Sequence, residues 1–297
     1  MLTEPITLVL GGMGVKGVAS IGILEALDSQ KIKIKKIYAA GASALVAGYY
    51  AMGKNPEELT DRFVNFFDSN DKLLWGLEQM SGLFQLQRRR ITDSFAYFLQ
   101  QRLYCRANAK RLSILTWDIV KPLIYEVFSN TDFSDLKIPM AISTIDLDAE
   151  KIFMIESGKL TDGMKAGIAF PGLFPPVSHK SHKLVSSTIC CELPLETITR
   201  IDSPVLAVDF PVILSHERPT DMLEIIARTT EIRSHAIKNR LLKKVDYVIT
   251  LERMNRFRWG SYRQIPLMIR YAREQTKHKL SLITKFQLTR RIPAVTL

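Results

Sequence analysis

A serine among small residues is the strongest candidate for chemistry in this sequence. The apolar segment 37–40 runs into Gly41-Ala42-Ser43, and a helical pattern continues from there. A serine on a sharp strand-to-helix turn has its hydroxyl raised above the sheet, and the helix N-terminus favours a nearby oxyanion. Gly41 and Ser43 fit the first half of the pattern G-x-S-x-G, whereas Leu45 replaces the second glycine. Because serine is also a common first residue of helices, a purely structural role stays open.

A glycine-rich turn precedes the serine and could bind a negative charge. The apolar segment 6–10 is followed by residues 11–17 (GGMGVKG), and a helix is predicted over 18–27. Closely spaced glycines allow backbone N–H groups to point into one concavity, which can hold a phosphate or an oxyanion. The turn therefore indicates either a nucleotide site or half of an acyl-transfer site.

Nucleotide binding fits the details less well than acyl transfer. Gly12, Gly14 and Gly17 have the spacing of a dinucleotide-binding loop, but no acidic residue ends the second predicted strand. A P-loop would need Lys and then Ser or Thr after its last glycine, and Gly17 is followed by Val18. A glycine turn after the first strand and a serine after the second are the two parts that acyl transfer needs.

These motifs, in this order, resemble the patatin-like phospholipase family. Its members open with a strand, a G-G-G-x-[KR]-G loop, a helix, a second strand and G-x-S-x-G. The resemblance covers about two thirds of the chain and continues through residues 55–59, 133–139, 143–147, 170–177 and 205–209.

The resemblance implies a three-layer α/β/α fold with a mainly parallel sheet. It also implies a serine acyl hydrolase that cleaves phospholipid or lysophospholipid esters, so a lipid or acyl ester is the expected ligand. Ser43 would be the nucleophile, and the amides of Gly12, Met13 and Gly14 would form the oxyanion hole. No cofactor and no metal are expected.

The resemblance fails at the catalytic base. Patatin-like enzymes use the aspartate of a D-G-[GA] motif, and alignment places Ser186 at that position. A serine does not accept a proton near neutral pH, so Ser43 would lack the group that activates it. Met13 in place of a loop glycine and Leu45 at the turn are two further departures. We expect weak or no hydrolysis, and the alternative is a non-catalytic protein that binds lipid or another protein.

Four other side chains are weighed as a replacement base. His179 and His182 lie on a polar predicted hairpin that is more simply a solvated tip. Asp162 falls at a predicted helix start, where aspartate is a favourable cap, and Asp209 ends a predicted strand. A structural role is favoured for all four.

Two domains are expected. Residues 1–216 would form the α/β domain, with an insertion of amphipathic helices at about 68–130 that could cover the site or contact lipid. Residues 217–297 would form a basic helical extension packed on it. With three cysteines, no signal segment and no long apolar run, the sequence predicts a cytoplasmic protein.

The last 46 residues carry most of the charge. From residue 252 onward, eleven Lys and Arg face two Glu, which is +9 of the formal +11. Apolar residues alternate with these charges, which predicts peripheral contact with an anionic membrane rather than a specific nucleic-acid site. The apolar set is Phe257, Trp259, Tyr262, Ile265, Leu267, Met268, Ile269 and Tyr271.

Overall fold

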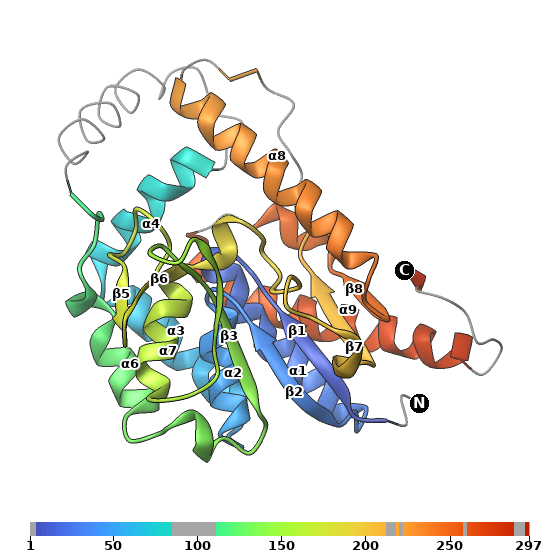
Figure 1. Ribbon diagram of the computed structural model, residues 1–297. Helices are drawn as coiled ribbons and strands as arrows, with labels where there is room; N and C mark the ends of the chain where they lie inside the picture. Colours follow the sequence, from blue (N-terminus) through green and yellow to red (C-terminus); the bar gives the residue numbers. More distant parts are fainter. Residues whose placement is uncertain are drawn as a thin grey trace.

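One mixed β-sheet organises the chain (Figure 1). The computed structural model describes residues 4–84, 111–211, 218–219, 222–257, 260–287 and 295–296. Within these residues the strand order is β5-β6-β3-β2-β1-β7-β8-β9, and β4 also pairs with β3. The strands are β1 Ile6–Leu10, β2 Ile34–Ala39, β3 Met140–Asp146, β4 Lys151–Ile155, β5 Val177–His179, β6 His182–Ser186, β7 Val205–Asp209, β8 Tyr247–Thr250 and β9 Val295–Thr296.

The pairing is mainly parallel, as the resemblance implies. Strands β3, β2, β1, β7, β8 and β9 are parallel neighbours, while β4, β5 and β6 add antiparallel pairs at one edge. Parallel strands end at the same edge of a sheet, so the turns after β1 and β2 are brought together. The predicted glycine loop and serine turn are these two turns.

Helices cover one face of the sheet and part of the other. Ile6, Leu8 and Leu10 of β1 belong to the large apolar core that the helices close, and Val9 belongs to a smaller core on the opposite face. All five β1 residues are buried, as expected for a strand covered on both faces. The helices are α1 Ser20–Ser29, α2 Ser43–Ala51, α3 Leu59–Asp68, α4 Asp71–Phe84, α6 Lys121–Phe128, α7 Leu160–Ile168, α8 Met222–Leu242 and α9 Ile265–Gln287.

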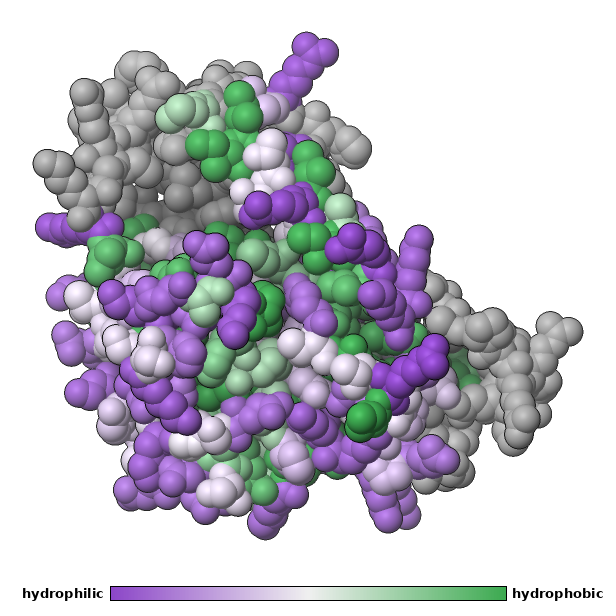
Figure 2. Space-filling view, viewed as in Figure 1, coloured by the Kyte–Doolittle hydropathy of each residue, from purple (hydrophilic) through white to green (hydrophobic). Residues whose placement is uncertain are grey.

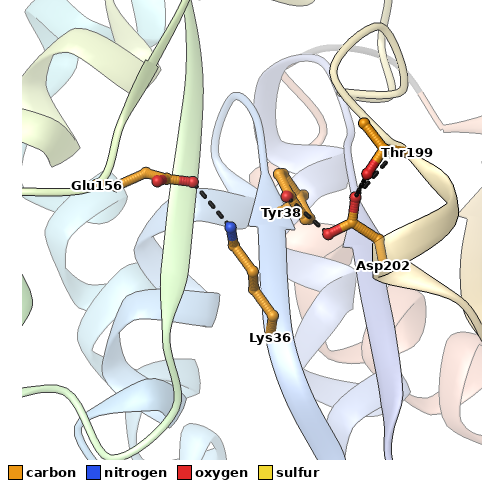
Figure 3. A network of polar contacts seen from close by, with 5 residues as sticks. All are labelled: Lys36, Tyr38, Glu156, Thr199 and Asp202. Carbon is orange, nitrogen blue, oxygen red and sulfur yellow. Dashed lines mark hydrogen bonds and ion pairs between the residues drawn. The ribbon is translucent and has the colours of Figure 1, made fainter.

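The opposite face is covered by the connection between β6 and β7 together with the end of α8. Buried Leu193 and Leu241 pack with Val9 in the smaller core. A polar network fixes the end of this connection (Figure 3): the Tyr38 hydroxyl donates to Asp202 Oδ1 over 2.9 Å, and the Thr199 amide donates to Asp202 Oδ2 over 2.8 Å. The connection therefore serves as a layer of the fold although little of it is helical.

The basic tail packs on the body of the protein, which changes the expectation of an interfacial segment. Ile265, Met268 and Ile269 are buried, and α9 packs along α1. A Cβ added at Gly22 of α1 would lie 2.1 Å from the carbonyl oxygen of Ile269, so the two helices are in close contact. The apolar side of α9 is therefore core, although Leu267 is 45% exposed. Trp259 lies outside the described residues.

Two basic residues of the tail are used in ion pairs. Arg273 Nε lies 2.7 Å from Glu25 Oε2 of α1, and Lys279 Nζ lies 2.9 Å from Glu252 Oε1. These contacts reduce the positive charge that α9 presents to a membrane. The tail is thus part of the packed fold, and contact of its exposed residues with a membrane stays a prediction.

The predicted division at residue 216 does not separate a helical extension from a complete sheet. Residues beyond 216 contribute β8, which pairs with β7, and β9, which pairs with β8. In the predicted insertion at 68–130, α4 and α6 are helical, and residues 85–110 lie outside the described part. None of the helices in the described residues is long and apolar enough to cross a bilayer.

Candidate active site

The glycine loop lies against the serine turn. Gly12 has φ +139° and Gly14 has φ +59°, both conformations that favour glycine. A Cβ at Gly17 would lie 2.5 Å from the backbone nitrogen of Ser43, so a glycine is needed for the two turns to approach this closely. The structure therefore brings together the two motifs that the sequence analysis paired.

Ser43 is the first residue of α2, and its hydroxyl points back into the protein. Its Oγ donates a hydrogen bond to the carbonyl oxygen of Ala40 over 2.8 Å, and the residue is fully buried. The left-handed conformation at this turn belongs to Gly41, with φ +68°, whereas the described non-glycine residues with positive φ do not include Ser43. In this conformation the hydroxyl caps a turn and is not presented to a substrate.

Ser186, which the sequence analysis aligns with the catalytic aspartate, lies two residues before a contact with the serine turn. It ends β6, and its Oγ is 3.0 Å from Thr188 Oγ1 in a buried hydroxyl pair. A Cβ at Gly41 would lie 3.0 Å from the Thr188 methyl carbon, so this segment touches the turn that carries Ser43. The β6 end that carries Ser186 is thus close to the turn of Ser43, and the role of position 186 as the place of the base stays a prediction.

A large apolar cavity opens next to these turns. It encloses about 770 Å³, including the open space at its mouth, and none of the described residues that line it carries a carboxylate or an imidazole. Its hydroxyls are those of Ser186 and Thr188, and Leu45 adds an apolar wall. The lining is Gly14, Val15, Val18, Gly41, Ala42, Leu45, Phe63, Phe66, Phe67, Leu73, Leu77, Val120, Leu123, Ile124, Ile168, Phe170, Leu173, Phe174, Ser186 and Thr188.

The three predicted oxyanion-hole residues do not share one cavity. Gly14 lines the apolar cavity, and Met13 lines a second, more polar one. The carbonyl oxygen of Gly12 would lie 2.7 Å from a Cβ at Gly41, so Gly12 packs against the turn. Met13 has φ −77° and ψ 141°, an extended conformation in keeping with the substitution of a glycine.

The other candidate bases are engaged elsewhere. His182 Nδ1 lies 2.5 Å from Asp146 Oδ2, and Asp162 forms an ion pair with Lys165 within α7. Asp209 Oδ1 lies 2.7 Å from Lys238 Nζ. His179 is buried, and burial lowers its pKa. None of these acids and imidazoles lines the described part of the apolar cavity.

A buried charge cluster behind the glycine loop was not anticipated from the sequence. Lys238 of α8 is 2% exposed and bonds to Asp209, to Glu192 Oε2 over 3.3 Å and to the carbonyl oxygen of Phe210 over 3.2 Å. Lys16 is also buried, which lowers its pKa, and Glu192 opposes that shift. No sequence motif marks Lys238, because it is one of several basic residues on a charged helix.

The family follows from comparison with known proteins. The model for "Patatin-like phospholipase" matches residues 8–196, which is more than half of the chain. The chain therefore belongs to the patatin-like phospholipase family, and its three-layer α/β/α fold with a mainly parallel sheet is the fold of that family.

The relatives are distant and mostly longer. The chain is 25% identical over 195 residues to "Lysophospholipase NTE1" of Cryptococcus neoformans, a match that covers 66% of this chain and 10% of that protein. It is 26% identical over 201 residues to an uncharacterized NTE family protein of Mycobacterium bovis, covering 67% of this chain and 46% of the relative. The chain thus matches less than half the length of each.

Among solved structures, VipD from Legionella pneumophila is similar to this chain. It aligns with a TM-score of 0.48 at 15% identity, over 94% of this chain and 67% of that one.

Proposed function

We propose that this protein binds a lipid with a long acyl chain and hydrolyses its ester weakly or not at all. The observation that carries the proposal is the lining of the apolar cavity beside Ser43. Its walls are almost entirely apolar, which suits a hydrocarbon chain. A lipid hydrolase needs a base within reach of the nucleophile, and the described lining offers two hydroxyls and no base.

The conformation of Ser43 supports the same reading. Its hydroxyl is bound to Ala40 and buried, so attack on an ester would require it to leave that bond and rotate toward the cavity. Gly41 and Ala42 line the cavity, so the Ser43 hydroxyl would move only a short distance to reach it. None of the described side chains that line the cavity would then accept the hydroxyl proton.

One contact favours weak hydrolysis over none. The glycine loop is packed directly on the Ser43 amide, as an acyl-transfer site requires. A protein with this assembly and no base could retain slow turnover by a water-assisted route. Relatives named lysophospholipase belong to the same family, which makes lysophospholipids the first substrates to test.

The membrane contact predicted for the tail has a better candidate on α8. Residues 222, 225, 226 and 232 recur at helical spacing on one face, and Met222, Ile225, Ile226 and Ile232 are 70, 50, 54 and 48% exposed. Figure 2 shows apolar surface over the upper part of this helix. Glu231, Ser234 and Lys238 lie on its opposite face and line the polar cavity.

This arrangement reverses the usual amphipathic helix, whose apolar face is buried. We therefore propose that the outer face of α8 contacts a lipid bilayer beside the cavities, and Arg233 on the same helix favours anionic lipid.

Two measurements on the same protein test the main proposal. Fluorescent fatty-acid binding should be saturable and displaced by a lysophospholipid, while a fluorophosphonate should label the protein no faster than Ser43→Ala. Rapid labelling of Ser43 would overturn the assignment of weak or absent hydrolysis. Absence of any lipid binding would overturn the binding function.

A further inference from the structure

A second cavity adjoins the apolar one and has a different chemical character. It spans about 410 Å³ when the open solvent at its mouth is included, and Phe170 and Thr188 line both cavities, so the two meet at these side chains. Its walls come from the glycine loop, from the segment after β6 and from one face of α8. The lining is Met13, Phe170, Thr188, Ile189, Glu192, Thr230, Glu231, Ser234, His235 and Lys238.

The charges that line this cavity do not cancel. Lys238 is its cation, and that ammonium is already bound to Asp209, Glu192 and a carbonyl oxygen. Glu231 has no such arrangement: within the described residues, no hydrogen bond or ion pair involves its carboxylate. Arg228, one turn earlier on α8, favours its charged form, as does Lys16, while Glu192 opposes it.

Glu231 therefore gains from a bound cation. Desolvation raises the pKa of its carboxyl to about 7, so the charged form is poorly stabilised by the protein alone. A cation in the cavity would supply the missing partner and would remain charged itself. A bound anion would meet two carboxylates instead.

The shape of the lining distinguishes between kinds of cation. Quaternary ammonium groups are recognised by several Trp, Tyr or Phe rings around the methyl groups, and Phe170 is the single residue of these three types in the described lining. A primary ammonium has three N–H donors, and the cavity offers acceptors for all of them in Glu231 and in the hydroxyls of Thr188, Thr230 and Ser234.

We propose that the polar cavity binds the primary ammonium of an ethanolamine-type head group while the acyl chain of the same lipid occupies the apolar cavity. This inference rests on the proposed lipid-binding function and assigns a head group to it. Glu231 is the residue that selects the ammonium, and Thr188 lies at the junction of the two parts.

The test compares three lysophospholipids that share one acyl chain and differ in head group. Their affinities are measured by displacement of a fluorescent fatty acid, below the concentration at which micelles form. The wild-type protein should bind lysophosphatidylethanolamine about tenfold more tightly than lysophosphatidylglycerol, the effect of one charged hydrogen bond. Lysophosphatidylcholine should fall between them.

Glu231→Gln should remove the preference for ethanolamine over glycerol and leave the affinity for lysophosphatidylglycerol within a factor of about three. Glu274→Gln is the matched control, because Glu274 is exposed on α9, and it should keep the wild-type preference. Equal binding of the ethanolamine and glycerol lipids by the wild-type protein would overturn the inference, as would tighter binding of the choline lipid or an unchanged preference in Glu231→Gln.

Failure of the proposed function gives a different result. If no lysophospholipid binds, the acyl cavity is not used, and the head group alone is then tested. Thermal stabilisation of the wild-type protein, but not of Glu231→Gln, by glycerophosphoethanolamine would support the ammonium site without a lipid function. Equal behaviour of the two proteins would overturn it.

Discussion

The Ser43 hydroxyl donates a hydrogen bond to the carbonyl oxygen of Ala40 over 2.8 Å, at the start of α2. This bond stabilises the turn and occupies the proton that a catalytic base would remove. The Ser43 hydroxyl therefore cannot cap the turn and attack an ester at the same time. Among the described residues it has a partner for the first role, the carbonyl oxygen of Ala40.

We expect ester hydrolysis near the level of Ser43→Ala. Loss of a general base reduces a rate by about 10²–10⁴-fold, and the sequence analysis predicts Ser186 at the position of that base. Release of p-nitrophenol from short-chain esters measures this, with heat-treated protein as the blank. Wild-type turnover clearly above that of Ser43→Ala would contradict the expectation.

Residues typical of the family should raise esterase activity most when they are introduced together. We expect the triple change Ser186→Asp, Leu45→Gly and Met13→Gly to raise esterase activity more than any single change, because base, turn and oxyanion hole depend on one another. Fluorophosphonate labelling and circular dichroism on each variant separate activity from folding. A triple variant that folds and stays unlabelled would show that position 186 does not supply the base.

The contact between α1 and α9 should be sensitive to one methyl group. Gly22→Ala would place a Cβ 2.1 Å from the Ile269 carbonyl oxygen, and overpacking of this kind costs about 1–3 kcal/mol. Urea unfolding gives the free-energy change. Gly260→Ala is the control, because its Cβ would meet Leu77 at 3.7 Å, an ordinary contact. Equal stability of both variants would mean that α9 is not packed on α1 as described.

Stability at acid pH should report on Asp146. Burial raises the pKa of its carboxyl, but hydrogen bonds from His182 and from the amides of Ala149 and Asp148 outweigh burial, and the net pKa is lowered. A lowered folded-state pKa gives stability that is present above the unfolded value, about 3.9, and is lost as the pH falls through the folded value. Asp146→Asn should therefore melt below the wild-type protein at pH 7.

The difference in melting temperature between wild type and Asp146→Asn should shrink toward pH 3, where the wild-type carboxyl is also becoming neutral. A difference that is constant over this range would assign the effect to packing instead of charge.

Membrane binding should depend on α8 more than on the tail. We expect the double change Ile225→Ser and Ile226→Ser to reduce co-sedimentation with anionic vesicles, since both side chains are about half exposed. Leu267→Ser, at an exposed apolar position on α9, is the matched control and should bind as the wild type does. If Leu267→Ser alone lost vesicle binding, the membrane contact would lie on the tail and not on α8.

Much of the fold could be predicted because the informative segments are local. A buried strand followed by glycines, and a second strand followed by Gly41-Ala42-Ser43, indicate a parallel pair whose two turns meet at one end of the sheet. The tail was harder, because basic and apolar residues at helical spacing are typical both of an interfacial helix and of a core helix with solvated arginines. The element that α9 packs against decides between these two structures. Nothing in the sequence around Gly22 of α1 indicates its contact with Ile269 on α9.

The sequence predicts that Ser43, Ser186 and the glycine loop form one site. The structure places Gly17 against the Ser43 amide and Thr188 against Gly41, whereas the role of Ser186 stays a prediction. The sequence does not indicate which way the Ser43 hydroxyl points, and it does not indicate that Gly41 is the left-handed residue of the turn. Nor does it indicate that Lys238 is buried, because pairing with Asp209 requires two segments far apart in sequence.

The position of β8 between β7 and β9 sets a limit on how the protein can be divided. A fragment that stops at residue 216, although it contains the whole family match, would leave β7 as an unprotected edge strand with unpaired backbone N–H and C=O groups. It would also uncover the side of α1 that α9 shields. Such a fragment is expected to aggregate through its open edge, so residues 217–297 protect the sheet against self-association.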